Sequence, residues 1–188
     1  SLAQFRGARE VAIAIIAKTH PVPHEHLLPP LLDALRAGGI PVESLTFYIA
    51  TGTHIPMPPD EFERVLPPEI ARGCRVVSHN CDDAANLVEL GVTTRGTQVV
   101  VNRAFYQADL KIVVGNIEPH HFAGFSGGYK TAAIGLAGRG AINHNHAMLT
   151  DPNSTIAEFA RNPLRQDIEE IGDFIGVHFA LNAILNGD

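Results

Sequence analysis

The chain has few cysteines, no long apolar run and no recognisable signal peptide. Its 188 residues include 2 cysteines, Cys74 and Cys81, too few for a disulfide framework, which fits a reducing compartment. The longest apolar stretch, residues 11–17, is far below the ~20 residues that a membrane span needs. The first residues lack the charged and apolar regions of a signal peptide. We therefore expect a cytoplasmic protein with no membrane partner.

Positive charge is also scarce. The 14 Lys and Arg residues against 20 Asp and Glu give a net charge of −6, and the basic residues form no run. This pattern excludes the electrostatic footprint of a nucleic-acid-binding protein. The 45% hydrophobic and 18% charged content is that of an ordinary globular domain. The length suits one domain, residues 1–188, with a small molecule as partner and the oligomeric state open.

Apolar runs define the expected fold. Residues 10–17 predict a strand buried on both faces, because apolar residues run on without alternation. Three further strands are expected: a second strand over residues 45–50, a core strand over residues 110–114 and a final strand over residues 177–185. A helix is expected over residues 24–37, between the first two strands. The order strand, helix, strand is typical of a βαβ unit. The predicted fold class is therefore α/β, a Rossmann-like layered domain with a mainly parallel sheet flanked by helices.

Several shorter elements are expected between and after these strands. Residues 58–66 and 138–148 predict helices, residues 75–78 predict a strand, and residues 87–101 predict a hairpin. Asn162 and Pro163 open a further helix over residues 164–174. We expect this helix to point its acidic residues outward, namely Asp167, Glu169 and Glu170.

Polar turns follow the expected strands. His20 lies shortly after the first strand, His54 after the second, and Asn116 after the strand over residues 110–114. In open parallel sheets, ligands bind beyond the carboxyl ends of the strands. We therefore expect His20 and His54 to face one crevice, which is the place for an active site.

Residues 115–146 hold an unusual concentration of histidine and glycine. Six glycines fall between Gly124 and Gly140, around a single lysine, Lys130, and no acidic residue lies between Glu118 and Asp151. Glycine lets backbone N–H groups approach an anion closely. Imidazoles are common metal ligands and proton carriers. The segment therefore indicates a site for a phosphorylated ligand with metal or acid–base chemistry, the alternative being a flexible loop with solvated histidines.

The histidines and the lysine of this segment leave several roles open. Lys130 suits a phosphate clamp or a covalent attachment point, or is simply solvated. His144 and His146 are two residues apart, so on a helix they point about 200° apart and cannot both reach one ion. We therefore expect one of the two to be structural. His121 is expected to lie outside the chemistry.

Familiar nucleotide-binding and zincin motifs are absent from the sequence. A P-loop needs the lysine directly after its last glycine, whereas Tyr129 separates Gly128 from Lys130 here. No G-x-G-x-x-G follows the first strand, and H-E-x-x-H does not occur. The standard P-loop and Rossmann fingerprints are therefore excluded.

Three blocks of the sequence resemble the N-terminal catalytic domain of the lactate racemase family: residues 51–54 (TGTH), residues 118–130 (EPHHFAGFSGGYK), and residues 145–146 (NH). The likeness extends from Ala17 to the end of the chain, including residues 162–163 and 181–182. The central block is long and unusual, which makes the resemblance specific. It implies the family's cofactor, the nickel-pincer nucleotide, a nicotinate mononucleotide derivative with two sulfur-containing groups.

The resemblance also implies roles for individual residues. Lys130 matches the lysine that binds the cofactor covalently, and His146 matches the nickel ligand. His54 and His120 match the two catalytic histidines, which exchange the hydroxyl proton while the Cα hydride passes to the cofactor. The nucleotide phosphate would be wrapped by the glycine loop, whose expected cofactor-binding residues are Gly124, Ser126, Gly127 and Gly128.

The first turn departs from the family pattern. Where the family has Asp-His-Thr-Arg-Pro, this chain has Ala17-Lys18-Thr19-His20-Pro21, so the acid and the arginine are replaced. An arginine fork suits a substrate carboxylate. We therefore expect a different hydroxy acid or sugar acid as substrate, with Lys18 or His20 binding its anion. The family's C-terminal domain is absent from these 188 residues, and a domain without it can be inactive alone.

Three functional hypotheses follow. The first is an isomerase, a racemase or epimerase of a 2-hydroxy acid that uses the nickel-pincer nucleotide on Lys130. The second is a non-catalytic phosphate- or nucleotide-binding module of the same fold. The third is a hydrolase whose zinc ion is held by His120, His144 and His146.

Overall fold

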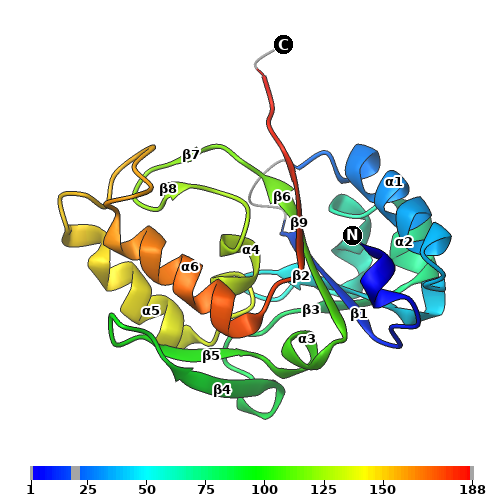
Figure 1. Cartoon of the computed structure of the whole chain (residues 1–188), viewed down its shortest axis with the longest axis horizontal. Coiled ribbons are helices and arrows are strands. Elements are labelled where there is room, and N and C mark those ends of the chain that lie inside the picture. Colours follow the sequence, from blue (N-terminus) through cyan, green and yellow to red (C-terminus); the bar gives the residue numbers. More distant parts are fainter. Residues whose placement is uncertain (1, 18–21, 187–188) are drawn as a thin grey trace.

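A five-stranded parallel sheet lies at the centre of the molecule, with strand order β3-β2-β1-β6-β9 (Figure 1). A computed structural model describes residues 2–17 and 22–186. Every neighbouring pair in this sheet is parallel, so the carboxyl ends of the strands meet at one edge. The strands are β1 (Val11–Ile16), β2 (Leu45–Ala50), β3 (Arg75–Ser78), β6 (Leu110–Asn116) and β9 (Phe179–Ala183).

Two hydrophobic cores, one on each face of the sheet, explain why β1 is a continuous apolar run. Val11, Ile13 and Ile15 of β1 belong to one core, whereas Ala12 and Ala14 belong to the other. Both sets of side chains are buried, so neither face needs polar residues. The small alanines let the helices on their side approach the sheet closely.

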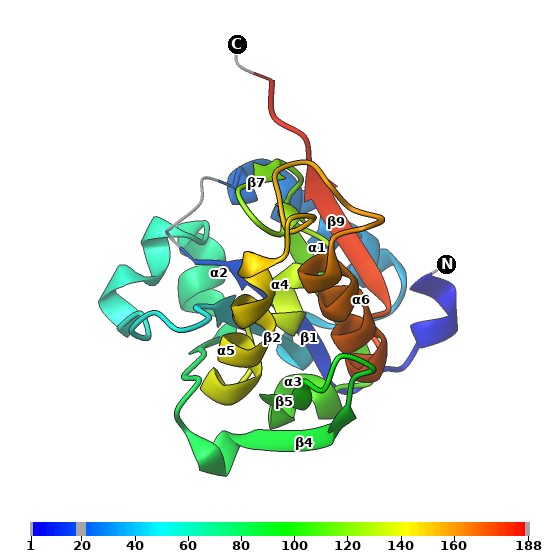
Figure 2. The same ribbon diagram turned by 90° about the vertical axis from the view of Figure 1, so that its left-hand side faces the viewer.

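Helices cover both faces of the sheet (Figures 1 and 2). One layer contains α1 (His24–Ala37) and α2 (Pro68–Gly73). The other contains α3 (Arg103–Gln107), α4 (Lys130–Ala133), α5 (Arg139–Ala147) and α6 (Pro163–Ile175). In the part of the chain that is described, no helix is long and apolar enough to cross a membrane.

Two small antiparallel pairs lie outside the central sheet, and short 3-10 turns connect the larger elements. The pairs are β4 (Leu87–Val92) with β5 (Gln98–Asn102), and β7 (Pro119–His120) with β8 (Gly124–Phe125). The 3-10 turns are Leu2–Phe5, Val42–Ser44, Pro59–Arg64, Ala84–Asn86 and Met148–Thr150.

The predicted α/β fold class is confirmed, and so are most elements. The helix over residues 24–37 and the strands over 45–50 and 75–78 have the expected bounds. The helix expected over residues 58–66 is a 3-10 turn, Pro59–Arg64, in which Pro58 and Pro59 restrict the start.

The expectation that Asp167 points outward from α6 was wrong. Its side chain is fully buried, because three donors from other elements satisfy the carboxylate. The hydroxyls of Thr93 and Thr97 donate to it at 2.6 and 2.8 Å, and Nδ2 of Asn145 donates at 2.8 Å. Asp167 therefore ties α6 to α5 and to the β4–β5 turn.

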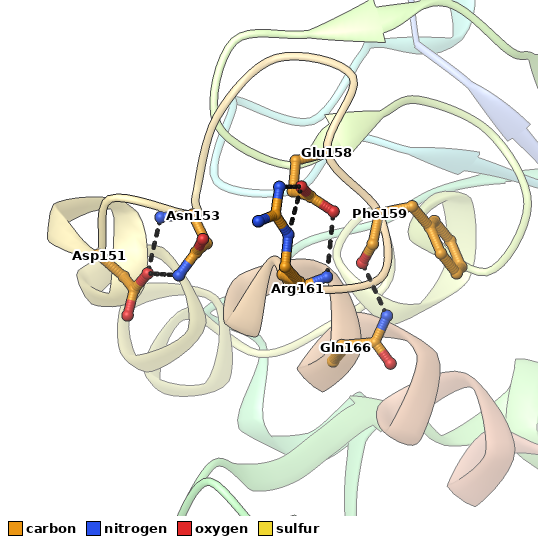
Figure 3. Close-up of polar contacts among 6 residues, drawn as sticks. All are labelled: Asp151, Asn153, Glu158, Phe159, Arg161 and Gln166. Carbon is orange, nitrogen blue, oxygen red and sulfur yellow. Dashed lines mark hydrogen bonds and ion pairs between the residues drawn. The ribbon is translucent and has the colours of Figure 1, made fainter.

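The loop between α5 and α6 is held by its own polar contacts (Figure 3). Asp151 accepts from the backbone and side-chain nitrogens of Asn153, at 2.8 and 3.1 Å. The carboxylate of Glu158 accepts three hydrogen bonds from Arg161. The backbone of Glu158 packs so closely on Gly124 of β8 that a Cβ at Gly124 would clash with its carbonyl oxygen. This contact seats the loop on the β7–β8 hairpin.

Replacing Gly172 of α6 by alanine should destabilise the protein. A Cβ at Gly172 would overlap the ring of Tyr129, which directly precedes α4 and Lys130. Overpacking of this kind costs about 1–3 kcal/mol. Gly140 of α5 is the matched control, because a Cβ added there would meet nothing within 4 Å. Chemical denaturation should show a lower free energy of unfolding for Gly172→Ala only, and equal values for both variants would contradict this packing.

Candidate active site

One pocket lies at the carboxyl ends of β1 and β2, against α4 and α5. Its walls come from the turn after β2, from β7, from the glycine loop and from both helices. Because these segments are distant in sequence, only the fold brings them together. Six of the residues singled out by sequence line this pocket: His54, His120, Ser126, Gly127, Lys130 and His146.

The glycine loop reaches the pocket by packing tightly on the sheet. A Cβ at Gly127, where φ is +72°, would lie 2.6 Å from the carbonyl oxygen of Asn116 at the end of β6. The next N–H, that of Gly128, donates to Oδ1 of Asn182 in β9 at 3.1 Å. The loop is thus fixed to two strand ends, and α4 begins immediately afterwards at Lys130.

Lys130 brings an amine with a lowered pKa to the pocket. Burial, followed by the nearby positive charge of Arg165, lowers the pKa of Lys130 to about 8, against a smaller raising effect of Glu118. A pKa of about 8 leaves a useful fraction of neutral amine near physiological pH, and a neutral amine is a nucleophile. Lys130 therefore suits covalent attachment better than an exposed lysine would.

His146 brings an imidazole to the same pocket from α5. Burial and then the charge of Lys130 lower the pKa of His146, so the ring is neutral at physiological pH. Its Nδ1 lies 3.1 Å from Oδ1 of Asn145, and its ring meets Phe122 edge-on with centroids 5.2 Å apart. A neutral, fixed imidazole is the form that binds metal ions.

His54 and His120 enter the pocket from different elements. His54 is exposed in the turn after β2, where its backbone N–H donates to the carbonyl of Thr51 at 3.1 Å. His120 of β7 is half-buried, and its Nδ1 accepts from the N–H of Ala123 at 3.2 Å. When neutral, the His120 ring held in this way carries its proton on Nε2. The two rings thus offer proton-transfer groups on separate walls.

Two hydroxyls beside Lys130 have no hydrogen-bond partner among the residues that the structure describes. The side chains of Ser126 and Thr131 are buried and line the pocket, and neither Oγ nor Oγ1 is satisfied. The Asn116 amide, at the end of β6, is also buried without a partner. Buried polar atoms are nearly always paired in proteins, so orphaned atoms in a pocket indicate a polar ligand.

Other predicted residues lie elsewhere. Gly124 packs against the loop that precedes α6, and Gly128 binds Asn182, so neither lines the pocket. His144 points away from His146, as their spacing predicted, and its Nε2 lies 3.1 Å from the carbonyl of Arg95.

The zinc set of His120, His144 and His146 is therefore not assembled. Among the described residues, no group of three or more His, Cys, Asp or Glu side chains could hold a metal ion. Lys18 and His20, the candidates for the substrate anion, lie outside the described residues.

Sequence reasoning missed three residues that shape the pocket: Asn145, Arg165 and Asp167. Asn145 contacts His146, Arg165 lowers the pKa of Lys130, and Asp167 holds Asn145. The sequence did contain one signal that Asp167 is buried. It lies three residues after Leu164 and four before Ile171, on the buried stripe of α6.

Comparison with known proteins agrees with this architecture. The family model of the lactate racemase N-terminal domain matches residues 2–157. A lactate racemase of Lactiplantibacillus plantarum is 30% identical over 185 residues, which are 97% of this chain and 43% of that protein. A lactate racemase of Thermoanaerobacterium thermosaccharolyticum is 29% identical over 182 residues, 96% of this chain and 42% of that protein.

Solved structures show the same fold. The lactate racemase apoprotein from Thermoanaerobacterium thermosaccharolyticum superposes with a TM-score of 0.91 at 28% identity, covering 98% of this chain and 44% of that one. A crystal structure of a Thermotoga maritima protein gives a TM-score of 0.79 at 23% identity, covering 100% of this chain and 49% of that one. The second likeness concerns the fold alone.

A parallel sheet covered on both faces, with a polar pocket at its carboxyl edge, defines an α/β ligand-binding domain. More specifically, the chain belongs to the lactate racemase family and matches its N-terminal domain. It spans 43% and 42% of the lengths of the two racemases that it matches.

Replacing Lys130 by methionine should raise stability near neutral pH. In the unfolded chain the amine keeps its ordinary pKa of 10.5, whereas in the fold it is about 8. Between these values the unfolded state binds more protons, so stability of the unaltered protein rises with pH. The advantage of Lys130→Met should therefore be full below about pH 8 and fade as the pH approaches 10.5. Thermal unfolding across this range measures it, and a pH-independent difference would contradict the burial of a charged amine.

Proposed function

We propose that residues 1–188 form the cofactor-binding and catalytic domain of a racemase or epimerase that acts on a 2-hydroxy acid. In this proposal a nickel-pincer nucleotide is attached to Lys130. The observation that carries it is the meeting of His54, His120, His146 and Lys130 in one pocket of a lactate racemase family member. A cytoplasmic location is part of the proposal, and the two free thiols, Cys74 and Cys81, support a reducing compartment.

Several groups of the pocket support the proposal of such a cofactor. The lowered pKa of Lys130, about 8, supports covalent attachment through its amine. Neutral His146 supports a role as nickel ligand, because imidazole nitrogen is a suitable donor for that ion. The unpartnered hydroxyls of Ser126 and Thr131 can bind polar atoms of the nucleotide. When bound, the cofactor would supply the centre that takes the hydride from the substrate Cα and returns it.

The two remaining histidines of the pocket would move the hydroxyl proton. One imidazole accepts the proton of the substrate hydroxyl as the Cα hydride leaves, and the other protonates the oxygen after hydride returns to the opposite face. The N–H of Ala123 occupies Nδ1 of His120, so Nε2 is the nitrogen of this ring that would exchange a proton with the substrate. His54 and His120 would have similar duties, each the acceptor in one direction and the donor in the other. The substrate loses and regains one hydride and one proton, so no outside oxidant is required.

The substrate is proposed to be a 2-hydroxy acid or sugar acid other than lactate. Ala17, which is buried at the end of β1, stands where the family has an acid, and His20 stands where it has an arginine. A methyl group cannot replace the hydrogen bonds of a carboxylate, so the substrate contacts must differ here. Lys18 or His20 remains the proposed partner of the substrate carboxylate.

The small volume of the pocket supports the proposal that a further domain covers the site. Its volume is about 190 Å³, below the ~300–1,000 Å³ typical of small-molecule sites. A nucleotide would therefore be enclosed only in part by these residues. We infer that the additional length of the relatives corresponds to a domain that covers the site, as in the family resemblance.

His54→Ala and His120→Ala test the proposed chemistry in the whole cofactor-loaded protein. Each should lower the rate of inversion at the substrate Cα by about 10²–10⁴-fold, the usual contribution of an acid–base group. A panel of hydroxy acids carrying deuterium at Cα provides the measurement. His144→Ala is the matched control, because its ring faces Arg95 and lies outside the pocket.

The outcome also separates the enzyme from a binding module. Unchanged inversion rates in both His54→Ala and His120→Ala would refute their catalytic role. Substrate or nucleotide binding without any inversion by the unaltered, loaded protein would favour the non-catalytic module instead.

A further inference from the structure

A continuous line of hydrogen bonds connects buried Asp167 of α6 with His146 in the pocket. Asp167 receives the hydroxyls of Thr93 and Thr97 and one N–H of Asn145. Asn145 then meets His146 through its amide oxygen, 3.1 Å from Nδ1. Asp167 and Asn145 are both fully buried, so solvent does not compete for these bonds.

The partners of Asn145 fix which way its amide points. Its Nδ2 lies 3.0 Å from the carbonyl oxygen of Leu164 and 2.8 Å from Oδ2 of Asp167. A backbone carbonyl can only accept, and the Asp167 carboxylate already accepts from hydroxyls, so both positions require an N–H donor. The two hydrogens of the Asn145 amide satisfy them both. Its oxygen must therefore face His146.

That orientation fixes the proton on His146. An amide oxygen can only accept, so Nδ1 of His146 must donate to Asn145. A neutral imidazole carries one N–H, which leaves the lone pair on Nε2. The ring nitrogen that is free of Asn145 is thus ready to bind a metal ion in the pocket.

His144 shows that this state is specific to one position of α5. Its Nε2 lies 3.1 Å from the carbonyl oxygen of Arg95, so Nε2 donates and carries the proton. Two histidines on the same helix are therefore held in opposite tautomers by different acceptors. Of these two rings of α5, that of His146 lines the pocket and leaves its Nε2 unengaged by Asn145.

We propose that Asn145 is a positioning residue that holds His146 in its metal-binding tautomer, and that Asp167 in turn holds Asn145. The identity of the metal, nickel, rests on the proposed function, whereas the tautomer does not. Partners of this kind behind a metal-binding histidine typically contribute 10–100-fold to metal affinity.

The tautomer can be measured directly in the cofactor-free chain. A long-range proton–nitrogen NMR spectrum at mildly alkaline pH reports which ring nitrogen of His146 carries the proton, with His146→Ala identifying the signal. We expect the proton on Nδ1. A proton on Nε2 in the unaltered chain would overturn the proposal, and this result needs no folded variant of Asn145.

Asn145→Leu tests the consequence for the metal. In the protein loaded with nickel-pincer nucleotide, we expect it to weaken nickel binding about 10–100-fold in a competition with a chelator. The same variant should give a mixture of His146 tautomers in the cofactor-free chain. Thr93→Val is the matched control, because its hydroxyl donates to the other carboxylate oxygen, Oδ1, and its loss leaves the three hydrogen bonds of Asn145. It should lose stability while keeping the tautomer and the nickel affinity.

Asp167→Asn tests the second step with little change of volume. Its neutral acceptor should polarise Asn145 less than a carboxylate does, which predicts a nickel affinity between those of the unaltered protein and Asn145→Leu. An affinity equal to the unaltered value would remove Asp167 from the proposal. Unchanged tautomer and affinity in folded Asn145→Leu would overturn the role of Asn145.

Nickel retention and the His146 tautomer together distinguish a failure of the proposed function from a failure of the role proposed for Asn145. An unaltered protein that retains no nickel contradicts the proposed function, while the NMR tautomer still decides the role of Asn145. Retained nickel together with the wrong tautomer contradicts only the role of Asn145.

Discussion

The site depends on one constraint, the parallel pairing of β1 with β2 on one side and β6 on the other. Ile15 is in register with both Ile49 and Val114, so these three strands end level with one another. The turn after β2 and the glycine loop therefore leave the sheet at the same edge. Gly127 completes the arrangement, because only a residue without a side chain can pack so closely on the end of β6. The pocket is a consequence of this common edge.

Buried polar groups in this fold have two different consequences. Asp167 has three donors and no exposure, so it stabilises the junction of α5, α6 and the β4–β5 turn. Lys130 and the hydroxyls of Ser126 and Thr131 are instead left with unfavourable surroundings or no partner. Groups of the first kind maintain the fold, whereas groups of the second kind suit the polar ligand that we propose for the pocket. His146 joins the two sets through Asn145.

The sequence predicted best those elements whose signals lie in neighbouring residues. The apolar run over residues 10–17 and the helix over residues 24–37 were predictable, because burial on both faces and helix ends leave nearby signals. The pocket residues followed from the family resemblance, although their roles are still predictions. Asp167 was misplaced, since its partners Thr93 and Thr97 lie 74 and 70 residues away in sequence and meet it only in the fold. The lowered pKa of Lys130 likewise depends on burial that no local pattern reveals.

We propose that Lys130 and His146 together hold a nickel-containing nucleotide. The most direct test is mass spectrometry of the peptide that contains Lys130, with metal analysis, on protein made alongside the enzymes that build the cofactor. We expect a mass increment on the peptide that contains Lys130. We also expect bound nickel in the unaltered protein, and its loss when His146 is replaced by alanine. An unmodified Lys130 with no retained nickel under these conditions would contradict it.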